Sequence, residues 1–143
     1  MKKENNMTLS FLSLSENEVF ARTVIAAFCL PLNPSLSQLN DIKTAVSEAV
    51  TNSVVHAYPN STGIINMEAN IANDTLHIKI SDNGVGIEDV EKALEPFYTT
   101  KPGDERSGMG FTIIESFMDT VSVNSKVNCG TIIEMSKIIN QSL

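Results

Sequence analysis

Three short segments contain residues whose types and spacing could do chemistry, and the first is "SDNGVGI" at residues 81–87. It places the carboxylate of Asp82 ahead of Gly84 and Gly86, in the pattern D-x-G-x-G. A carboxylate accepts hydrogen bonds, and glycines let a ligand approach the backbone closely. A calcium loop is excluded because an EF-hand needs oxygen ligands where Gly84, Gly86 and Ala93 stand. A Rossmann loop is excluded because no helix of a βαβ unit follows. A ligand site and a plain Asx turn in solvent both remain open.

The second segment, "SEAVTNSVVHA" at residues 47–57, carries Glu48, Asn52 and His56 at intervals of one helical turn. On a helix this spacing forms a row along one side, at the rim of the apolar stripe. Glu48 could act as a general base, and Asn52 as an oxygen ligand of Mg²⁺. A solvated helix rim is the simpler interpretation of this pair alone, and His56 fits a capping or packing role.

The third segment, "FYTTKPGDERSGMGFTI" at residues 97–113, joins a threonine pair and a lysine to a polar loop and to "SGMG". Glycines at a helix start let backbone N–H groups approach phosphate oxygens, and the helix dipole favours an anion there. Lys101 and Arg106 would add positive charge nearby. A flexible surface loop before a glycine-marked helix explains the same residues, so each segment is ambiguous by itself.

The helices that must position these residues follow from the spacing of apolar side chains. The Ser15–Glu18 pair has the spacing of a capping box, which marks a helix start. Helices are expected at 15–30, from about 35 to 57, near 88–94 and at 108–119.

The strands follow from alternation of apolar and polar residues. An edge strand, a hairpin that turns after Asn73, and two closing strands are expected at 7–15, 63–72, 74–82, 120–125 and 130–138. By the two-residue period, Asp82 shares a face with the apolar residues of its strand, so its carboxylate points toward the core and needs a donor. The element order predicts an α+β two-layer sandwich, with a mixed, mostly antiparallel sheet covered on one face by helices.

Composition limits the classes of function. With 143 residues, 42% hydrophobic and 19% charged, the chain is expected to form one domain over 1–143. A net charge of −7 argues against a nucleic-acid or anionic-membrane surface, and leaves room for a basic protein partner. The longest apolar run is too short for a bilayer and no secretory signal is evident, so a cytoplasmic protein is expected. Cys29 and Cys129 are expected to be reduced, mostly buried thiols.

Together and in this order, the three segments resemble the GHKL (Bergerat) ATP-binding fold: E-x-x-x-N on a helix, D-x-G-x-G after a strand, then T-T-K and G-x-G before a helix. Within that superfamily, "VSEAVTNSVVHAY", "FYTTKP" and "ERSGMGFTIIESFMD", with "NEVFAR" near the start, are similar to the anti-sigma-factor serine kinases. The resemblance covers nearly the whole chain. It implies that "SDNGVGI" holds a nucleotide base.

At the base end of the site, the resemblance implies that Asp82 accepts a hydrogen bond from the adenine amino group. Gly84 and Gly86 would let the backbone pass close to the base, and Thr131 would help to bind a bridging water. These assignments also supply the donor that an inward-facing Asp82 requires.

At the phosphate end, the resemblance implies that Glu48 is the general base for an incoming serine hydroxyl and that Asn52 ligates Mg²⁺ between the phosphates. A lid loop at about 95–108 and a phosphate cradle would be formed by Thr99, Thr100, Lys101, Arg106, Ser107, Gly108 and Gly110. ATP or ADP and Mg²⁺ are therefore the expected cofactors.

The resemblance further implies two protein partners. One is an anti-anti-sigma protein that is phosphorylated on a serine, and the other is a sporulation sigma factor held inactive in an ATP-dependent complex. Arg22, in "NEVFAR", would contact both, and a homodimer is expected. Autophosphorylation on histidine is disfavoured because the chain has no room for a dimerisation helix pair.

Two alternatives to a kinase are kept. One is a nucleotide-gated sigma-binding module without kinase activity, which would not need Glu48 as a base. The other is a plain ATPase such as gyrase B or MutL, which the absence of a transducer domain disfavours.

Overall fold

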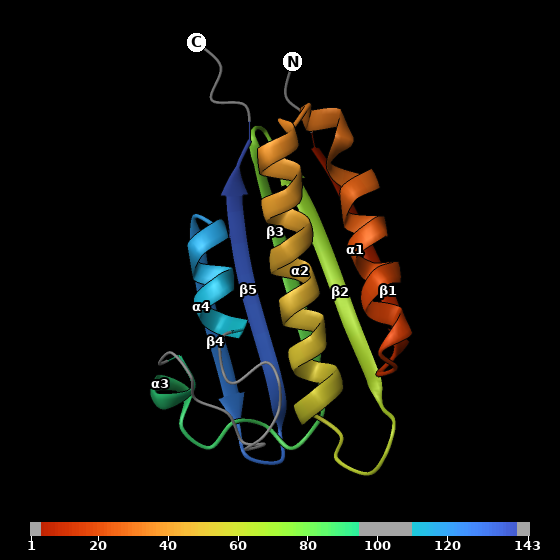
Figure 1. The fold of residues 1–143 in the computed structure, drawn as a ribbon, viewed down its shortest axis with the longest axis vertical. Helices are drawn as coiled ribbons and strands as arrows, with labels where there is room; N and C mark the ends of the chain where they lie inside the picture. The colour runs from red at the N-terminus through yellow and green to blue at the C-terminus, as the bar shows by residue number, and fades with distance from the viewer. Residues whose placement is uncertain (1–3, 95–109, 140–143) are drawn as a thin grey trace.

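The computed structural model describes residues 4–94 and 110–139, and a single sheet lies at its centre (Figure 1). Its strands are β1 (Glu4–Leu12), β2 (Ile64–Ala72), β3 (Thr75–Asp82), β4 (Thr120–Lys126) and β5 (Gly130–Ile138). They lie in the order β1-β2-β3-β5-β4, and every neighbouring pair is antiparallel. Within the described residues β1 is an edge strand, as its sequence predicts.

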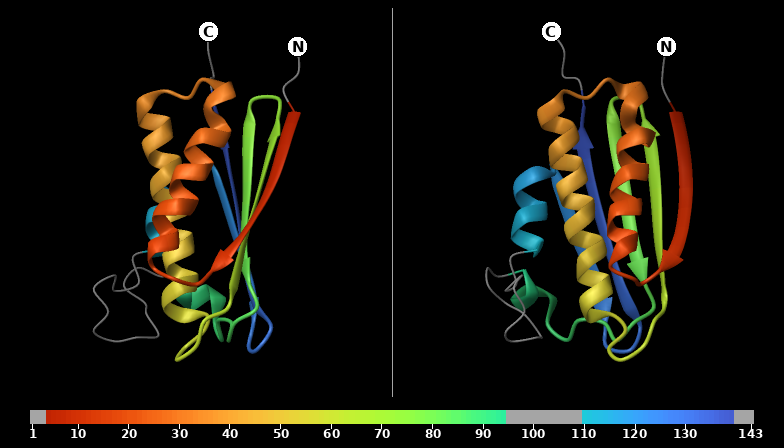
Figure 2. Two further views of the ribbon diagram at one scale, coloured as in Figure 1. Left: turned by 90° about the vertical axis from the view of Figure 1, so that its right-hand side faces the viewer. Right: turned by 45° about the vertical axis from the view of Figure 1, so that its right-hand side comes forward.

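The helices form the second layer. They are α1 (Glu16–Cys29), the short 3₁₀ helix η1 (Leu30–Leu32), α2 (Leu36–His56), α3 (Val90–Ala93) and α4 (Gly110–Phe117). Figure 2 shows α1, α2 and α4 on one face of the sheet, while the opposite face carries no described helix. The predicted α+β two-layer sandwich is confirmed, but the described sheet is antiparallel throughout and not mixed.

The hydrophobic core fills the space between α2 and the inner face of the sheet. Burying each large aliphatic side chain contributes roughly 1.5–3 kcal/mol. This packing holds α2 in a fixed position over β3 and β5. The fully buried aliphatic residues of α2, β2, β3 and β5 include Ile42, Val46, Val50, Ile65, Leu76, Ile78, Ile80 and Ile133.

The start of α2 is defined by a capping box. Ser35 Oγ accepts from Gln38 N–H at 3.1 Å, and Ser35 N–H donates to Gln38 Oε1 at 2.9 Å. The capping box predicted at Ser15 is wrong, because that residue is helical and its side chain makes no cap hydrogen bond. Glu18 accepts a hydrogen bond from the Ser47 hydroxyl of α2 instead, so its carboxylate links the two helices.

Two details refine the expected strands and thiols. Asn73 takes a left-handed conformation, φ 59°, so an asparagine does what glycine often does in tight hairpin turns. Cys29 is buried, and burial raises the pKa of its thiol. The expectation of burial is wrong for Cys129, which is exposed just before β5.

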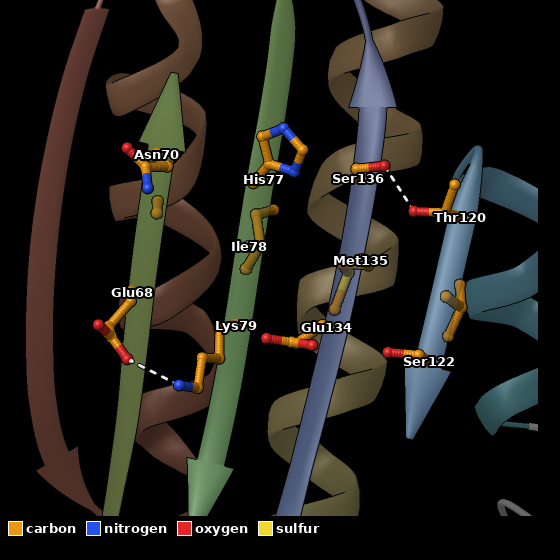
Figure 3. Close-up of a pocket in the computed structure, with 12 residues that line it drawn as sticks. Glu68, Asn70, His77, Ile78, Lys79, Thr120, Ser122, Glu134, Met135 and Ser136 are labelled. Atoms are coloured by element: carbon orange, nitrogen blue, oxygen red, sulfur yellow. Dashed lines mark hydrogen bonds and ion pairs between the residues drawn. The ribbon is translucent and has the colours of Figure 1, made fainter. Parts of the chain in front are cut away.

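The open face of the sheet carries a shallow polar groove of about 550 Å³, seen from the side opposite the helices in Figure 3. Its side chains are partly paired with one another: Lys79 lies 3.7 Å from Glu68, and the hydroxyls of Thr120 and Ser136 are 2.5 Å apart. None of the residues predicted to bind nucleotide lines this groove. Among the described helices, none combines the length and apolarity needed to cross a membrane.

Candidate functional site

Strand β3 ends beside the C-terminal end of α2 (Figure 1). Its last residue, Asp82, belongs to a row of residues that crosses the sheet there. Asp82 lies opposite Thr131 of β5, and Thr131 lies opposite Ser125 of β4. Directly opposed residues of antiparallel strands point to the same face. Because Asp82 and Thr131 are both buried, the row forms a polar floor on the helix side of the sheet.

The Asp82 carboxylate is held by two donors. Ser53 of α2 donates its hydroxyl to Oδ2 at 2.9 Å, and Gly84 donates its N–H to Oδ1 at 2.9 Å. Asp82 is 5% exposed and Ser53 is 2% exposed, so the inward orientation predicted for Asp82 is confirmed and a position in solvent is wrong. The bond from Gly84 N–H is that of an Asx turn, but the turn is buried. Each carboxylate oxygen has more than one acceptor position, so Asp82 can still accept a hydrogen bond from a ligand.

The loop after Asp82 is tied to the end of α2 through its backbone. Asn83 N–H donates to the Tyr58 hydroxyl at 2.9 Å, and Val85 N–H donates to the Ala57 carbonyl at 2.8 Å. Each bond satisfies a backbone group that would otherwise be left without a partner. These bonds fix the position of the loop relative to the C-terminal end of α2.

The opposite side of the loop is tied to the β4–β5 hairpin. Ile87 N–H donates to Ser125 Oγ at 2.7 Å, and the Val85 carbonyl accepts from Asn128 N–H at 2.7 Å. The loop is thus held between the end of α2 and the end of the β4–β5 hairpin. These contacts fix the backbone next to the Asp82 carboxylate.

Both glycines of D-x-G-x-G are required by close packing of protein backbone. A Cβ on Gly84 would lie 2.1 Å from the Ala57 carbonyl oxygen. Gly86 has φ +75°, and a Cβ there would lie 2.0 Å from the Lys126 carbonyl oxygen. Their predicted role in approach to a base stays a prediction.

We expect Gly84→Ala to lower the free energy of unfolding by about 1–3 kcal/mol, because the new methyl group must displace the backbone of α2. Chemical denaturation followed by circular dichroism measures this. Asn83→Ala, which changes an exposed side chain in the same loop, is the matched control, and its effect should stay within about 0.5 kcal/mol. Equal stability of the two variants would contradict the packing argument.

The C-terminal half of α2 carries the other predicted chemical groups. Glu48 and Asn52 are half-buried, as expected for the rim of the apolar stripe. Gly110, the first residue of α4, lies against Glu48, since a Cβ on it would be 3.6 Å from Glu48 Oε2. At a rise of about 1.5 Å per residue, Glu48 lies roughly 7.5 Å along the axis from Ser53. The same helix thus places Glu48 next to the first residue of α4 and Ser53 within hydrogen-bond distance of Asp82.

The remaining residues of the predicted lid and cradle cannot be placed in this way. They lie outside the described residues: Thr99, Thr100, Lys101, Arg106, Ser107 and Gly108.

Arg22 lies on α1, where its guanidinium is 3.6 Å from Glu18, and its side chain is 38% exposed. An exposed ion pair one turn apart contributes little to stability. The guanidinium is therefore accessible on the outer surface of the α1–α2 layer.

Sequence reasoning assigned no role to Ser53, Tyr58 or Ser125. Ser53 has the spacing of the apolar stripe of its helix, and a polar residue at such a position indicates a buried hydrogen-bond partner. Nothing local marks Tyr58 or Ser125, because their partners become visible only once strand register and helix position are known.

A bound Mg²⁺ is compatible with the residues present. The described residues contain no group of three or more His, Cys, Asp or Glu that could hold a metal alone. Mg²⁺ beside a nucleotide needs only one or two protein ligands, since phosphates and water supply the rest. The amide oxygen of Asn52, one residue before Ser53, fits such a single ligand.

Comparison with known proteins gives close relatives over the full length. Residues 13–137 match the family model of the histidine kinase-like ATPase domain. The anti-sigma F factor of Clostridium kluyveri is 51% identical over 137 residues, which cover 96% of each chain. The anti-sigma F factor of Caldanaerobacter subterraneus subsp. tengcongensis is 51% identical over 142 residues, which cover 99% of each chain.

Solved structures share the fold at low identity. The RsbU and RsbW domains of Rv1364c from Mycobacterium tuberculosis superpose with a TM-score of 0.67 at 16% identity, covering 94% of this chain and 32% of that one. The catalytic domain of the histidine kinase ThkA superposes with a TM-score of 0.60 at 16% identity, covering 93% of this chain and 96% of that one. At these identities the likeness shows a common fold alone.

Proposed function

The chain belongs to the anti-sigma F factor family and contains a histidine kinase-like ATPase domain, and from this premise we propose that it is an ATP-dependent anti-sigma factor and protein serine kinase. It binds a sporulation sigma factor and keeps it inactive. It also transfers the terminal phosphate of ATP to a serine of an anti-anti-sigma protein.

One observation supports the proposal: the same helix, α2, contacts both the Asp82 carboxylate and, through Glu48, the first residue of α4. Ser53 is hydrogen-bonded to Asp82, which is the group suited to an adenine amino donor. Glu48 lies five residues earlier on the same helix, next to the first residue of α4. A nucleotide with its base at Asp82 would therefore have its phosphates directed toward Glu48.

The chemistry follows from this placement. Phosphoryl transfer depends on positioning and charge neutralisation more than on covalent help from the protein. Glu48 accepts the proton of the incoming serine hydroxyl, and the backbone N–H groups at the N-terminal end of α4 would stabilise the phosphates. Asn52 is the protein ligand for Mg²⁺, which neutralises phosphate charge when bound.

The direct test is incubation of the protein with Mg²⁺, ATP labelled in its terminal phosphate, and a candidate anti-anti-sigma protein. We expect label on a serine of the acceptor and none on this chain. Sigma-factor binding with ATP but no label transfer would favour the nucleotide-gated binding module. Steady phosphate release without an acceptor would favour a plain ATPase.

Partner binding is proposed to use the exposed guanidinium of Arg22, which suits a carboxylate on the partner. If the sigma factor and the anti-anti-sigma protein share this contact, one displaces the other by direct competition. The negative net charge of the chain, −7, also favours a partner with a basic surface around that carboxylate.

We expect Arg22→Ala to weaken capture of the sigma factor by about tenfold or more, because buried arginines dominate many interfaces. Nucleotide affinity should stay unchanged. Lys79→Ala is the matched control, since Lys79 is a similarly exposed cation, 41% exposed and ion-paired, on the open face of the sheet. Titration calorimetry with each partner measures both variants, and equal sigma-factor binding by Arg22→Ala and the wild type would reject the contact.

A homodimer is part of the proposal. The edge strand β1 is paired only with β2 among the described residues, and Val19 and Phe20 of the following helix, α1, are exposed. Unpaired strand edges and exposed apolar residues favour association with a second chain. Sedimentation equilibrium with and without ATP tests this directly.

A further inference from the structure

We propose that Ser125, on the edge strand β4, is a positioning residue that sets which way the Thr131 hydroxyl donates. This inference rests on the proposed nucleotide site and adds a determinant of base specificity to it. Its basis is a chain of contacts that ends at the polar floor beside Asp82.

The Ser125 hydroxyl is surrounded by three polar groups. It accepts from Ile87 N–H at 2.7 Å, it can donate to the Gly130 carbonyl at 2.9 Å, and its oxygen lies 2.8 Å from Thr131 Oγ1. Thr131 is 5% exposed, so its hydroxyl must share its hydrogen bonds with near neighbours or a ligand. Ser125 is a described hydrogen-bond partner of that hydroxyl.

The single proton of Ser125 decides the state of Thr131. If Ser125 donates to the Gly130 carbonyl, Thr131 must donate to Ser125 and can offer a ligand only lone pairs. If Ser125 donates to Thr131, the Thr131 proton is free to point beside the Asp82 carboxylate. A hydroxyl rotates at little cost, so the ligand selects between these two states.

An adenine edge matches only the second state. Adenine presents an amino donor next to a ring-nitrogen acceptor, N1, whereas guanine presents a carbonyl acceptor next to an N–H donor. The Asp82 carboxylate accepts from the amino group. A donating Thr131, directly or through one water, then satisfies N1. Asp82 then acts as the acceptor and Thr131 as the donor, a pair that matches adenine and not guanine. Ser125 supports this pair by keeping Thr131 in the donating state.

The test pairs variants of Ser125 with two ligands: ADP, and the diphosphate of 1-deazaadenosine, in which C–H replaces N1. For the wild type we expect ADP to bind about tenfold more tightly than the deaza analogue. Ser125→Val should lose most of this preference, to within about twofold, because no side chain then donates to the Thr131 oxygen and nothing directs the Thr131 proton toward N1. Ser125→Thr keeps the hydroxyl in a similar shape and should retain the preference.

The valine and threonine variants have nearly the same shape and both suit a strand, so they differ chiefly in the hydroxyl. Ser122→Ala, on the same strand but facing the open side of the sheet, is the control and should bind both ligands like the wild type. Thermal unfolding of each variant confirms that the domain is folded.

The outcomes separate this inference from the proposed function. Equal weakening of ADP and deaza-ADP by Ser125→Val would mean a purely structural role and would overturn the inference while leaving the nucleotide site in place. Loss of the preference in Ser125→Thr would overturn it as well. Failure of the wild type to bind ADP would overturn the proposed function, and this inference with it.

Discussion

Glu48→Gln is expected to lower phosphoryl transfer to the anti-anti-sigma protein by about 10²–10⁴-fold, because a glutamine amide cannot accept the serine proton. ATP and ADP affinity should change little, since glutamine keeps the shape of the side chain. Single-turnover transfer of labelled phosphate measures the first quantity, and titration calorimetry measures the second.

The physical basis of this prediction is the place of Glu48 on α2. The side chain is half-buried and lies against the first residue of α4, away from the polar floor proposed to bind the base. Glu115→Gln, an exposed carboxylate on α4 itself, is the matched control and should transfer phosphate normally. Undiminished transfer by Glu48→Gln would remove Glu48 from the role of base and would favour the binding-module alternative.

Asp82→Asn is expected to weaken ADP binding by about a hundredfold or more, while the domain still folds. Asp82 accepts from Ser53 and Gly84 and retains acceptor positions for a base amino group. In asparagine one of the two oxygens becomes an NH₂ group, so a donor replaces an acceptor at a buried position. A hydrogen bond to a charged group contributes about 1.5–3 kcal/mol, and a buried mismatch costs more.

Asp119→Asn is the matched control for this substitution. Asp119 also accepts from a backbone N–H, that of Ile138 at 2.7 Å, but it lies at the other end of β5. Because Asp119 is exposed, its variant should change stability less than Asp82→Asn does, and its ADP affinity in calorimetry should be unchanged. Wild-type ADP affinity in a folded Asp82→Asn protein would show that Asp82 does not read the base.

The two predictions together separate binding from chemistry. Asp82→Asn removes nucleotide binding, so transfer is lost as a consequence. Glu48→Gln leaves the nucleotide bound and removes transfer alone. If both variants lost ATP affinity equally, the division of α2 into a base end and a phosphate end would be wrong.

The sequence by itself determined the elements and the outline of the site. The apolar period of α2, the alternation of β2 and β3 and the turn at Asn73 are local patterns, so helix, strands and hairpin could be predicted without any long-range information. The inward orientation of Asp82 followed from the same two-residue period. The wrong capping box at Ser15 shows the limit of such patterns, because the Glu18 carboxylate accepts a hydrogen bond from Ser47 on another helix and does not cap its own helix.

Only the tertiary structure decided what surrounds Asp82. Ser53 comes from a helix 29 residues earlier in the chain, and Ser125 from a strand 38 residues beyond the loop that it holds. These pairings depend on strand register and on the seating of α2 over the core, neither of which a local pattern encodes. The candidate chemical groups could therefore be predicted from local sequence patterns. The hydrogen-bond partners that orient each group could be identified only in the folded structure.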